Sequence, residues 1–232
     1  MKTLAFDTSN KTLSLAILDN DSLLADLTLN IKKNHSISLM PAIDFLMQSI
    51  DLTPKDLDRI AVAQGPGSYT GLRVAVATAK TLAYSLKIDL VGISSLYALA
   101  AASSQPDALV VPLIDARRQF VYAGFYQNKK AIKQDTYIAF TDLLDSLKGE
   151  GAKKLIFVGE TAPFEDQIKT LLPQAQIKAS LPSAFEMGKA ALSLEAQDVN
   201  AFVPNYLKRV EAEENWLKDH VSDQTDQYIK RV

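Results

Sequence analysis

The sequence predicts an α/β protein made of two similar halves, each with a mixed five-stranded sheet flanked by helices. Two observations carry this prediction. Short runs of alternating apolar residues, typical of strands, are interrupted by longer runs with apolar residues three or four apart, typical of helices. The order β-β-β-α-β-α-β occurs twice, at an offset of about a hundred residues that suits a duplicated domain rather than a solenoid repeat. Similarity of the two halves by chance is the alternative.

The elements of the first half can be identified in order from the start of the chain. Three strand-like runs, KTLAFDTS, TLSLAILD and SLLADLTL, are separated by turn-like NK and ND pairs and predict an antiparallel meander. A helix is expected from about Leu39 to Ile50, with Ser38 as its N-cap and Pro41 in its first turn, where the missing N–H costs no hydrogen bond. The strand RIAVAQ, the helix LRVAVATAKTLAYSLK and the strand DLVGIS follow.

The second half repeats this order after a small, polar linker at about residues 101–107. Three strands (ALVVPLIDA, QFVYAGFYQ, KAIKQDTYIA) precede a helix (TDLLDSLK), a strand (KLIFVGE), a helix (PFEDQIKTLL), a strand (AQIKAS) and a last helix (SAFEMGKAALSLE). We expect one subdomain over residues 1–103, a second over residues 104–205 and a tail over residues 206–232. We expect the tail to be helical and to pack back on the first subdomain, and the alternatives are a frayed or disordered end and docking onto a partner.

The composition limits the classes of function. The 232 residues include no cysteine, which excludes a disulfide framework, a thiolate metal site and a cysteine nucleophile. No run approaches the roughly 20 apolar residues of a membrane span, and Asp7 interrupts the first apolar run, so we expect a cytoplasmic protein without a signal peptide. The 25 basic and 27 acidic residues are scattered, and basic pairs such as Arg117-Arg118 lack interleaved aromatic residues, which disfavours tight RNA or DNA binding by the chain alone.

A glycine-rich loop, GPGSYTGLR, lies between a predicted strand and a predicted helix. It lacks the Gly-Lys-Ser/Thr ending of a Walker loop, and Gly65, Gly67 and Gly71 are spaced one residue too widely for the dinucleotide fingerprint. Amides at the helix start could bind an anion with the help of Arg73. Alternatively, the glycines only give the turn its backbone angles, with Pro66 stiffening it. We favour this structural interpretation.

Asp7 and Asp115 each end the first strand of a half at a hairpin. This arrangement resembles ATPases of the actin and hexokinase type, whose duplicated domains each supply an aspartate beside a glycine-containing turn that clamps the phosphates of ATP. The order of elements therefore predicts the actin-like ATPase (ribonuclease H-like) fold. The turns DTSN and DARRQ contain no glycine, and Arg117 and Arg118 bring long side chains where backbone would approach phosphate. These arginines either contact an anion or pair with surface carboxylates, and ATPase activity is disfavoured.

A metal site and a hydrolytic triad have little support in the sequence. The two histidines are His35 and His220, and the position where a helical ligand pair needs a second histidine is Leu39. No G-x-S-x-G motif accompanies the serines. We therefore expect no catalytic residue, no metal and no cofactor.

The helices of the first half are more apolar than one sheet face requires. In the second helix, Ala75, Ala79 and Ala83 form a face with almost no side-chain volume, which lets another helix approach closely. The first helix has an apolar stripe and further apolar residues beside it; these are Leu39, Ile43, Leu46 and Ile50, and Met40, Phe45 and Met47. The surplus packs inside the chain or against another chain.

Five segments resemble the bacterial TsaB family, also called YeaZ. They are LAFDTSNKTLSLAIL, an H…LMP element, GPGSYTGLRVAVATAKTLA, DARRQFVYAGFY and PNYLKR, in this order to about residue 210. The resemblance implies an accessory subunit without catalytic activity. Its complex transfers threonylcarbamoyl from its adenylate to the adenosine beside the anticodon of tRNAs that read codons beginning with A. The implied partners are the catalytic paralogue TsaD and the ATPase TsaE, with a homodimer in isolation and only indirect contact with tRNA.

The resemblance also suggests a role for the helical surface, because TsaB and TsaD pair through helices of the N-terminal domain. The expected interface consists of Leu39, Met40, Ile43, Met47, Arg73, Ala75, Ala79 and Ala83. Ala79→Arg is then expected to leave the monomer folded and abolish pairing. The glycine loop positions the second helix, with Tyr69 and Arg73 as contacts to the partner or to a nucleotide.

Two other enzyme classes are weighed against this. TsaD carries a metal-binding H-x-x-x-H motif, and the matching positions here are His35 and Leu39, which disfavours a metallopeptidase. The main alternative function is an ATP-dependent small-molecule kinase of the same fold, which would require a glycine beside Asp7 and another beside Asp115.

Overall fold

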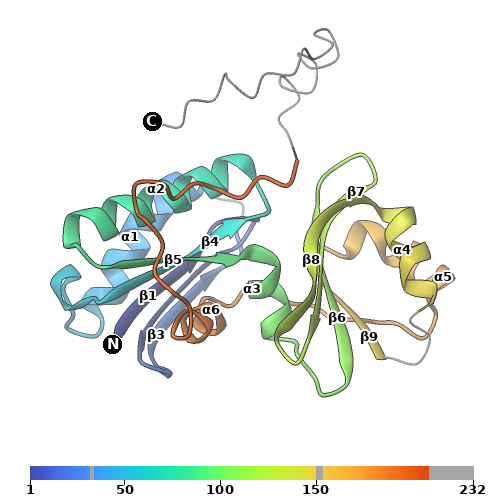
Figure 1. Cartoon of the computed structure of the whole chain (residues 1–232), viewed down its shortest axis with the longest axis horizontal. Helices are drawn as coiled ribbons and strands as arrows, with labels where there is room; N and C mark the ends of the chain where they lie inside the picture. The colour runs from blue at the N-terminus through green and yellow to red at the C-terminus, as the bar shows by residue number, and fades with distance from the viewer. Residues whose placement is uncertain (32–33, 150–153, 209–232) are drawn as a thin grey trace, which may run out of the picture.

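The computed structural model describes residues 1–31, 34–149 and 154–208, and its two halves lie side by side, each built on one sheet (Figure 1). The strand orders are β3-β2-β1-β4-β5 and β10-β9-β6-β7-β8. In each sheet three strands pair antiparallel, and the fourth and fifth run parallel to the first. The two sheets thus have the same topology, which confirms the predicted duplication and the mixed five-stranded sheets.

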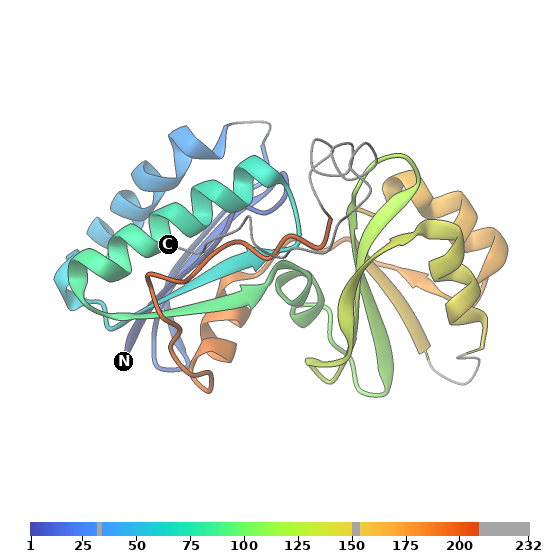
Figure 2. The ribbon, with the colours of Figure 1, turned by 45° about the horizontal axis from the view of Figure 1, so that its top comes forward.

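The first half consists of a sheet with a layer of two helices on one of its faces. Its elements are β1 (Lys2–Asp7), β2 (Leu13–Asp19), β3 (Ser22–Leu29), α1 (His35–Gln48), a 3-10 turn η1 (Pro54–Asp56), β4 (Arg59–Gly65), α2 (Tyr69–Leu86), β5 (Asp89–Ser94) and α3 (Ser95–Ala101). Helices α1 and α2 lie next to each other over one face of the sheet (Figure 2). Because side chains alternate along a strand, Leu4 and Phe6 of β1 face these helices while Ala5 faces the opposite side.

Helix α1 begins four residues earlier than the sequence predicts. Asn34, not Ser38, is the N-cap, and its Oδ1 accepts a hydrogen bond from the amide of Ser36 at 3.2 Å. Pro41 therefore lies inside the helix and not in its first turn. Both Asn34 and Ser38 are favourable capping residues, so side-chain preference alone does not choose between them.

Helix α3 was not predicted. Ser94 caps it by accepting hydrogen bonds from the amides of Leu96 and Tyr97 at 3.1 and 3.3 Å. Its apolar residues pack with strands of the second sheet, including Val110 and Ile156. A short helix buried in this way has no polar face, so the amphipathic period that reveals a surface helix is missing.

The second half has its own core beneath two helices. Its elements are β6 (Ala108–Asp115), β7 (Phe120–Gln127), β8 (Lys130–Ala139), α4 (Phe140–Lys148), β9 (Lys154–Gly159), a 3-10 turn η2 (Ala162–Phe164), α5 (Glu165–Leu171) and β10 (Gln176–Ile177). Phe140 and Phe164, with ring centres 4.3 Å apart, lie in this core. None of the helices in the described ranges could span a bilayer.

The last helix, α6 (Ala184–Ala191), returns to the first half and covers the face of its sheet opposite α1 and α2 (Figure 1). A Cβ added at Gly188 would clash with Leu18, so the glycine permits a close approach. Arg59 of β4 donates hydrogen bonds to the carbonyls of Ala191 and Leu194. The expected subdomain boundary at residue 205 therefore does not follow the packing, because α6 completes the core of the first half.

After α6 the chain runs in extended form over the first half, in a segment that we call the strap (residues 197–208). The Gln197 amide donates to the carbonyl of Leu90 on β5, and the Asn205 amide donates to the carbonyl of Gln64, each at 2.8 Å. Phe202 is buried in the core beside α2. The rest of the expected tail, from residue 209, lies outside the described residues.

Candidate functional site

Asp7, at the end of β1, is fully buried. Its Oδ1 accepts a hydrogen bond from the amide of Ser9 at 2.6 Å. Asp7 Oδ2 and Ser9 Oγ are buried without a hydrogen-bond partner in the described part of the chain. Burial raises the pKa of Asp7 to about 6, against the opposing effects of the hydrogen bond from the Ser9 amide and the charge of His35.

This carboxyl should make the chain less stable at neutral pH than in acid. The pKa of Asp7 is higher in the folded chain than its ordinary value of 3.8, so stability falls as the pH rises through this interval and the loss is complete above about 6. The shift corresponds to about 3 kcal/mol. We expect Asp7→Asn to raise the free energy of unfolding at pH 8 and to change it little at pH 4, measured by urea denaturation. An equal effect at both pH values would contradict a buried charge.

The glycine loop packs backbone against backbone on the β1–β2 hairpin. The Ser68 amide donates to the carbonyl of Ser9 at 2.6 Å, and Thr8 Oγ1 donates to the carbonyl of Gly71 at 2.8 Å. A Cβ added at Gly71 would clash with the Thr8 carbonyl oxygen, and one at Gly67 with that of Ser9.

The ends of this loop are also held in place. Gly65 lies against the carbonyl of Asn205 in the strap, and Pro66 is buried. The Ser68 hydroxyl caps α2 by accepting a hydrogen bond from the Gly71 amide at 3.3 Å. These contacts support the structural interpretation of the loop, because its backbone groups bind the protein itself.

The β6–β7 hairpin takes an unusual backbone conformation. Arg117, Arg118 and Gln119 all have positive φ, at 69°, 53° and 61°, a region that non-glycine residues adopt rarely. The Arg117 amide donates to Asp115 Oδ1 at 2.8 Å, and the Asp115 amide donates to Glu160 Oε2 at 2.9 Å. The turn is thus held by the carboxylate of Asp115 and by that of Glu160, which follows β9, and both arginines are exposed.

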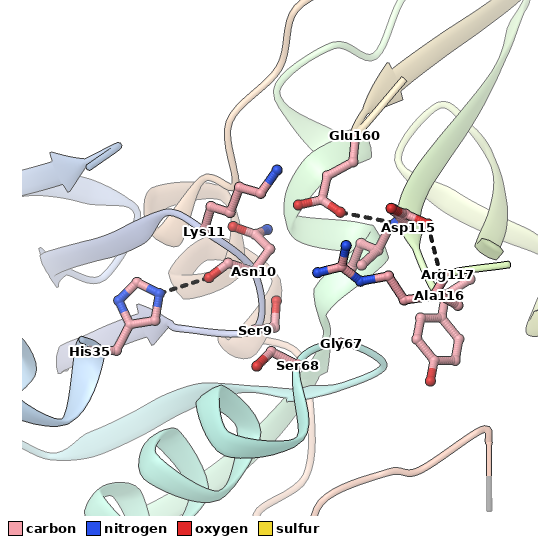
Figure 3. Close-up of a pocket in the computed structure, with 12 residues that line it drawn as sticks. Ser9, Asn10, Lys11, His35, Gly67, Ser68, Asp115, Ala116, Arg117 and Glu160 are labelled. Atoms are coloured by element: carbon pink, nitrogen blue, oxygen red, sulfur yellow. Dashed lines mark hydrogen bonds between the residues drawn. The ribbon is translucent and has the colours of Figure 1, made fainter. Parts of the chain in front are cut away.

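The two hairpins face each other across a cavity of about 450 Å³ between the halves (Figure 3). Lys11 from the first hairpin and Arg117 from the second contribute positive charge, and Asp115 and Glu160 contribute negative charge. The lining is completed by Ser9, Asn10, His35, Gly67, Ser68, Ile114, Ala116 and Tyr122. A second cavity, of about 500 Å³, shares Asn10, Lys11, Asp115 and Glu160 with the first and extends to Gly159 and Thr161.

The cavity contains groups that can bind an anion, but Asp7 does not line it. His35 Nε2 lies 2.7 Å from the carbonyl oxygen of Asn10, and Leu39 is buried in the core. Across the described ranges, His, Asp and Glu side chains form no group of three that could hold a metal ion. Sequence reasoning missed Asn10 and Lys11 as lining residues, although their position in the turn that follows Asp7 was an available signal.

Most of the residues assigned to a partner interface are used inside the chain. Six of them have no more than 4% of their surface exposed and belong to the first core: Leu39, Ile43, Met47, Ala75, Ala79 and Ala83. The small face of α2 lets this helix approach its own sheet, so that expectation is wrong for these six. Met40 and Arg73 remain exposed.

A different apolar surface faces solvent on α1 and α2, and we call it the outer helix face. Its large exposed members are Ile37, Met40, Phe45 and Tyr84. Thr70, Ala77 and Thr81 lie on the exposed side of α2, where their small side chains protrude little from the helix. Ile37 and Phe45 fall outside the buried stripe of α1, which is the sequence signal that separates this surface from the core.

Two sheets of one topology, enclosing a cleft between aspartate-bearing hairpins, define a protein of the actin-like ATPase fold whose hairpin turns lack glycine. The chain belongs to the TsaB family. It is 40% identical to the tRNA threonylcarbamoyladenosine biosynthesis protein TsaB of Bacillus subtilis over 227 residues, which cover 94% of this chain and 99% of that protein. It is 32% identical to the protein of the same name from Buchnera aphidicola subsp. Schizaphis graminum, over 68% of this chain and 77% of that protein.

Three further matches concern the fold and the wider family. The TsaD model, described as tRNA N6-adenosine threonylcarbamoyltransferase, matches residues 22–216. A crystal structure from Pseudomonas aeruginosa, of an uncharacterized protein with similarity to peptidase YEAZ, superposes with a TM-score of 0.76 at 25% identity and covers 89% of this chain and 99% of that one. The ethanolamine utilization protein EutJ of Carboxydothermus hydrogenoformans has the same fold, with a TM-score of 0.51 at 13% identity.

Proposed function

We propose that this chain is a non-catalytic, required subunit of a cytoplasmic complex that transfers threonylcarbamoyl to the adenosine beside the anticodon of tRNA. Its partners are a catalytic TsaD-like paralogue and a TsaE-like ATPase. The observation that carries the proposal is the match to B. subtilis TsaB along nearly the whole chain. The match of residues 22–216 to the TsaD family supports descent from a common ancestor with the proposed partner.

The geometry of the cleft supports an accessory role. The carboxyl of Asp7 is buried below the cavity surface, and the turn after Asp115 carries arginines instead of glycine. Neither hairpin therefore offers a glycine turn to the phosphates of ATP. The contribution of this chain to the reaction is then to bind and orient its partners.

The outer helix face is the surface that we assign to the TsaD-like paralogue. Ile37 and Phe45 on α1 and Tyr84 on α2 expose between 63% and 73% of their surface, which is unusual for large apolar side chains. Thr70, Ala77 and Thr81 give α2 a low outer side onto which a helix can pack. A second copy of this chain would cover the same surface in isolation, so the homodimer competes with the heterodimer.

A reconstituted transfer reaction tests the proposal. It contains the TsaD-like and TsaE-like partners, ATP, tRNA and preformed threonylcarbamoyl-adenylate, with or without this chain, and mass spectrometry of tRNA nucleosides detects the product. We expect threonylcarbamoyladenosine only when the chain is present. Equal product in its absence would refute the required role.

Ala77→Arg should prevent pairing without unfolding the chain. Ala77 is exposed at the middle of the outer side of α2, where a long cationic side chain would hold a partner helix away. We expect at least a hundredfold weaker binding to the paralogue in analytical ultracentrifugation, with an unchanged thermal unfolding midpoint. The matched control is Ala131→Arg on β8, an exposed alanine of the second half that should pair normally. If Ala77→Arg paired with the paralogue as tightly as the wild type does, α2 would not be part of the interface.

An ATP-dependent small-molecule kinase is the second candidate. The observation that favours it is the cavity between the hairpins, where Lys11 and Arg117 provide positive charge for phosphate. Phosphoryl transfer to a panel of small-molecule alcohols, with Lys11→Gln as a comparison, would support this function. No transfer under conditions where the tRNA product forms would exclude it.

A further inference from the structure

Exposed aromatic rings lie next to a basic group where the end of the strap meets the start of α2. Tyr206 stacks on Tyr69 of α2 with ring centres 5.3 Å apart and planes inclined by 27°. Arg73 Cζ lies 5.2 Å from the centre of the Tyr69 ring. The two tyrosines remain 44% and 47% exposed although they contact each other. Both rings are therefore partly available to a third planar group.

A second cluster of aromatic rings with a cation lies on the other half, where the rings of Phe120, Tyr122 and Tyr137 are only partly exposed. Lys208, which ends the described strap, places its Nζ 5.4 Å from the centre of the Tyr137 ring. Tyr137 stacks on Phe120 with ring centres 4.9 Å apart and planes inclined by 15°. Tyr122, whose ring centre is 5.6 Å from that of Tyr137, lines the cavity that also contains Arg117.

The strap joins the two clusters into one surface. It runs alongside α2 and ends between the two halves, beside β8 (Figure 2). We define the aromatic–cation ridge as Tyr69, Arg73, Tyr206, Lys208, Tyr137 and Phe120. These residues come from α2, the strap, β8 and β7, so they lie far apart in the sequence. A search of the sequence for basic residues with aromatic neighbours could therefore not find this surface.

We propose that the aromatic–cation ridge binds a single-stranded segment of tRNA. Exposed rings stack unpaired bases, and neighbouring cations neutralise the phosphates between them, which is how proteins bind single strands with little sequence preference. This inference rests on the proposed function, because it takes the tRNA of the complex as its ligand. It replaces the expectation of purely indirect contact with tRNA.

The ridge is better suited to add to the tRNA affinity of a complex than to bind RNA tightly by itself. The formal net charge of the chain is −2, which opposes tight association with a polyanion. A weak contact gains effective affinity when a linked subunit already holds the same ligand. The ridge should therefore affect the tRNA affinity of the assembled complex.

Two pairs of variants test the ridge in the assembled complex with the TsaD-like paralogue and fluorescently labelled tRNA. Tyr206→Ala removes a stacking ring and should weaken tRNA binding about tenfold, whereas Tyr206→Phe keeps the ring and should bind within about twofold of the wild type. Lys208→Gln should lower the slope of log affinity against log salt by about 0.7, the value for one phosphate contact on a single strand. Lys55→Gln, an exposed lysine of η1 and the charge-matched control, should leave the slope unchanged.

The outcomes separate the ridge from the proposed function. Wild-type affinity and salt slope in both Tyr206→Ala and Lys208→Gln would overturn the ridge, even if the complex modifies tRNA and needs this chain. Product formation without the chain would refute the proposed function, whatever the variants do. A benzoylphenylalanine photo-crosslinker at position 206 identifies the occupant. An adduct with tRNA supports the inference, and an adduct with residues 209–232 or with the paralogue overturns it.

Discussion

Replacing Ala79 by arginine should unfold the first half of the chain. Ala79 is completely buried in the core that α2 forms with the sheet. A guanidinium group there would have neither space nor a counter-charge, and this combination of overpacking and charge burial costs more than about 4 kcal/mol. Because natural domains are stable by only about 5–15 kcal/mol, we expect a large loss of soluble protein and of the cooperative urea transition.

Ala77→Arg is the matched control for this prediction. It introduces the same side chain two residues away on the same helix, at an exposed position. Its free energy of unfolding should lie within about 0.5 kcal/mol of the wild type. If Ala79→Arg were as stable as Ala77→Arg, α2 could not be packed on the sheet by its alanine face.

Gly71→Ala should produce the second large effect. A Cβ at this position would clash with the carbonyl oxygen of Thr8, which is backbone and cannot rotate away. Either the start of α2 or the β1–β2 hairpin must move, and the hydrogen bond from Thr8 Oγ1 to the Gly71 carbonyl would be strained. Overpacking of this kind costs about 3 kcal/mol. Urea denaturation of the purified variant measures the loss.

Gly149→Ala provides the comparison for this substitution. A Cβ added at Gly149 meets no atom within 4 Å, so the variant should be as stable as the wild type or slightly more stable. Equal stabilities of the two variants would show that α2 and the hairpin do not approach each other as closely as described. A loss confined to Gly71→Ala would also explain why the loop requires glycine without any bound phosphate.

The strands and their order could be predicted from the sequence because each strand carries its own signal. β5 (Asp89–Ser94) and β8 (Lys130–Ala139) have the predicted bounds, since alternation and flanking turns depend only on neighbouring residues. The repeat of the element order then fixed the fold class. Helix α3 was missed because burial removes its polar face, and the start of α1 was misplaced because two good caps compete.

The candidate site was harder to predict because it depends on contacts between distant segments. The small face of α2 fits a partner helix and its own sheet equally well, and only the burial of Ala75 and Ala83 shows that the sheet uses it. The sequence singled out Asp7, yet its isolation from the cavity follows from packing around the hairpin. The two clusters of the ridge are brought together only because the strap carries Tyr206 to α2 and Lys208 to β8.

The packing of α6 on the first sheet has a consequence for how the chain folds during its synthesis on the ribosome. Domains normally fold as units, from the N-terminus onward, while synthesis continues. Here the face of the first sheet that contains Ala5, Ala16 and Ala61 is covered by a helix made after the whole second sheet. This apolar face of the nascent first half therefore stays exposed to solvent until α6 emerges from the ribosome, and the first half cannot complete its folding before then. A chain that ends before residue 184 would lack α6, so its first half would not fold stably and the fragment would be prone to aggregation.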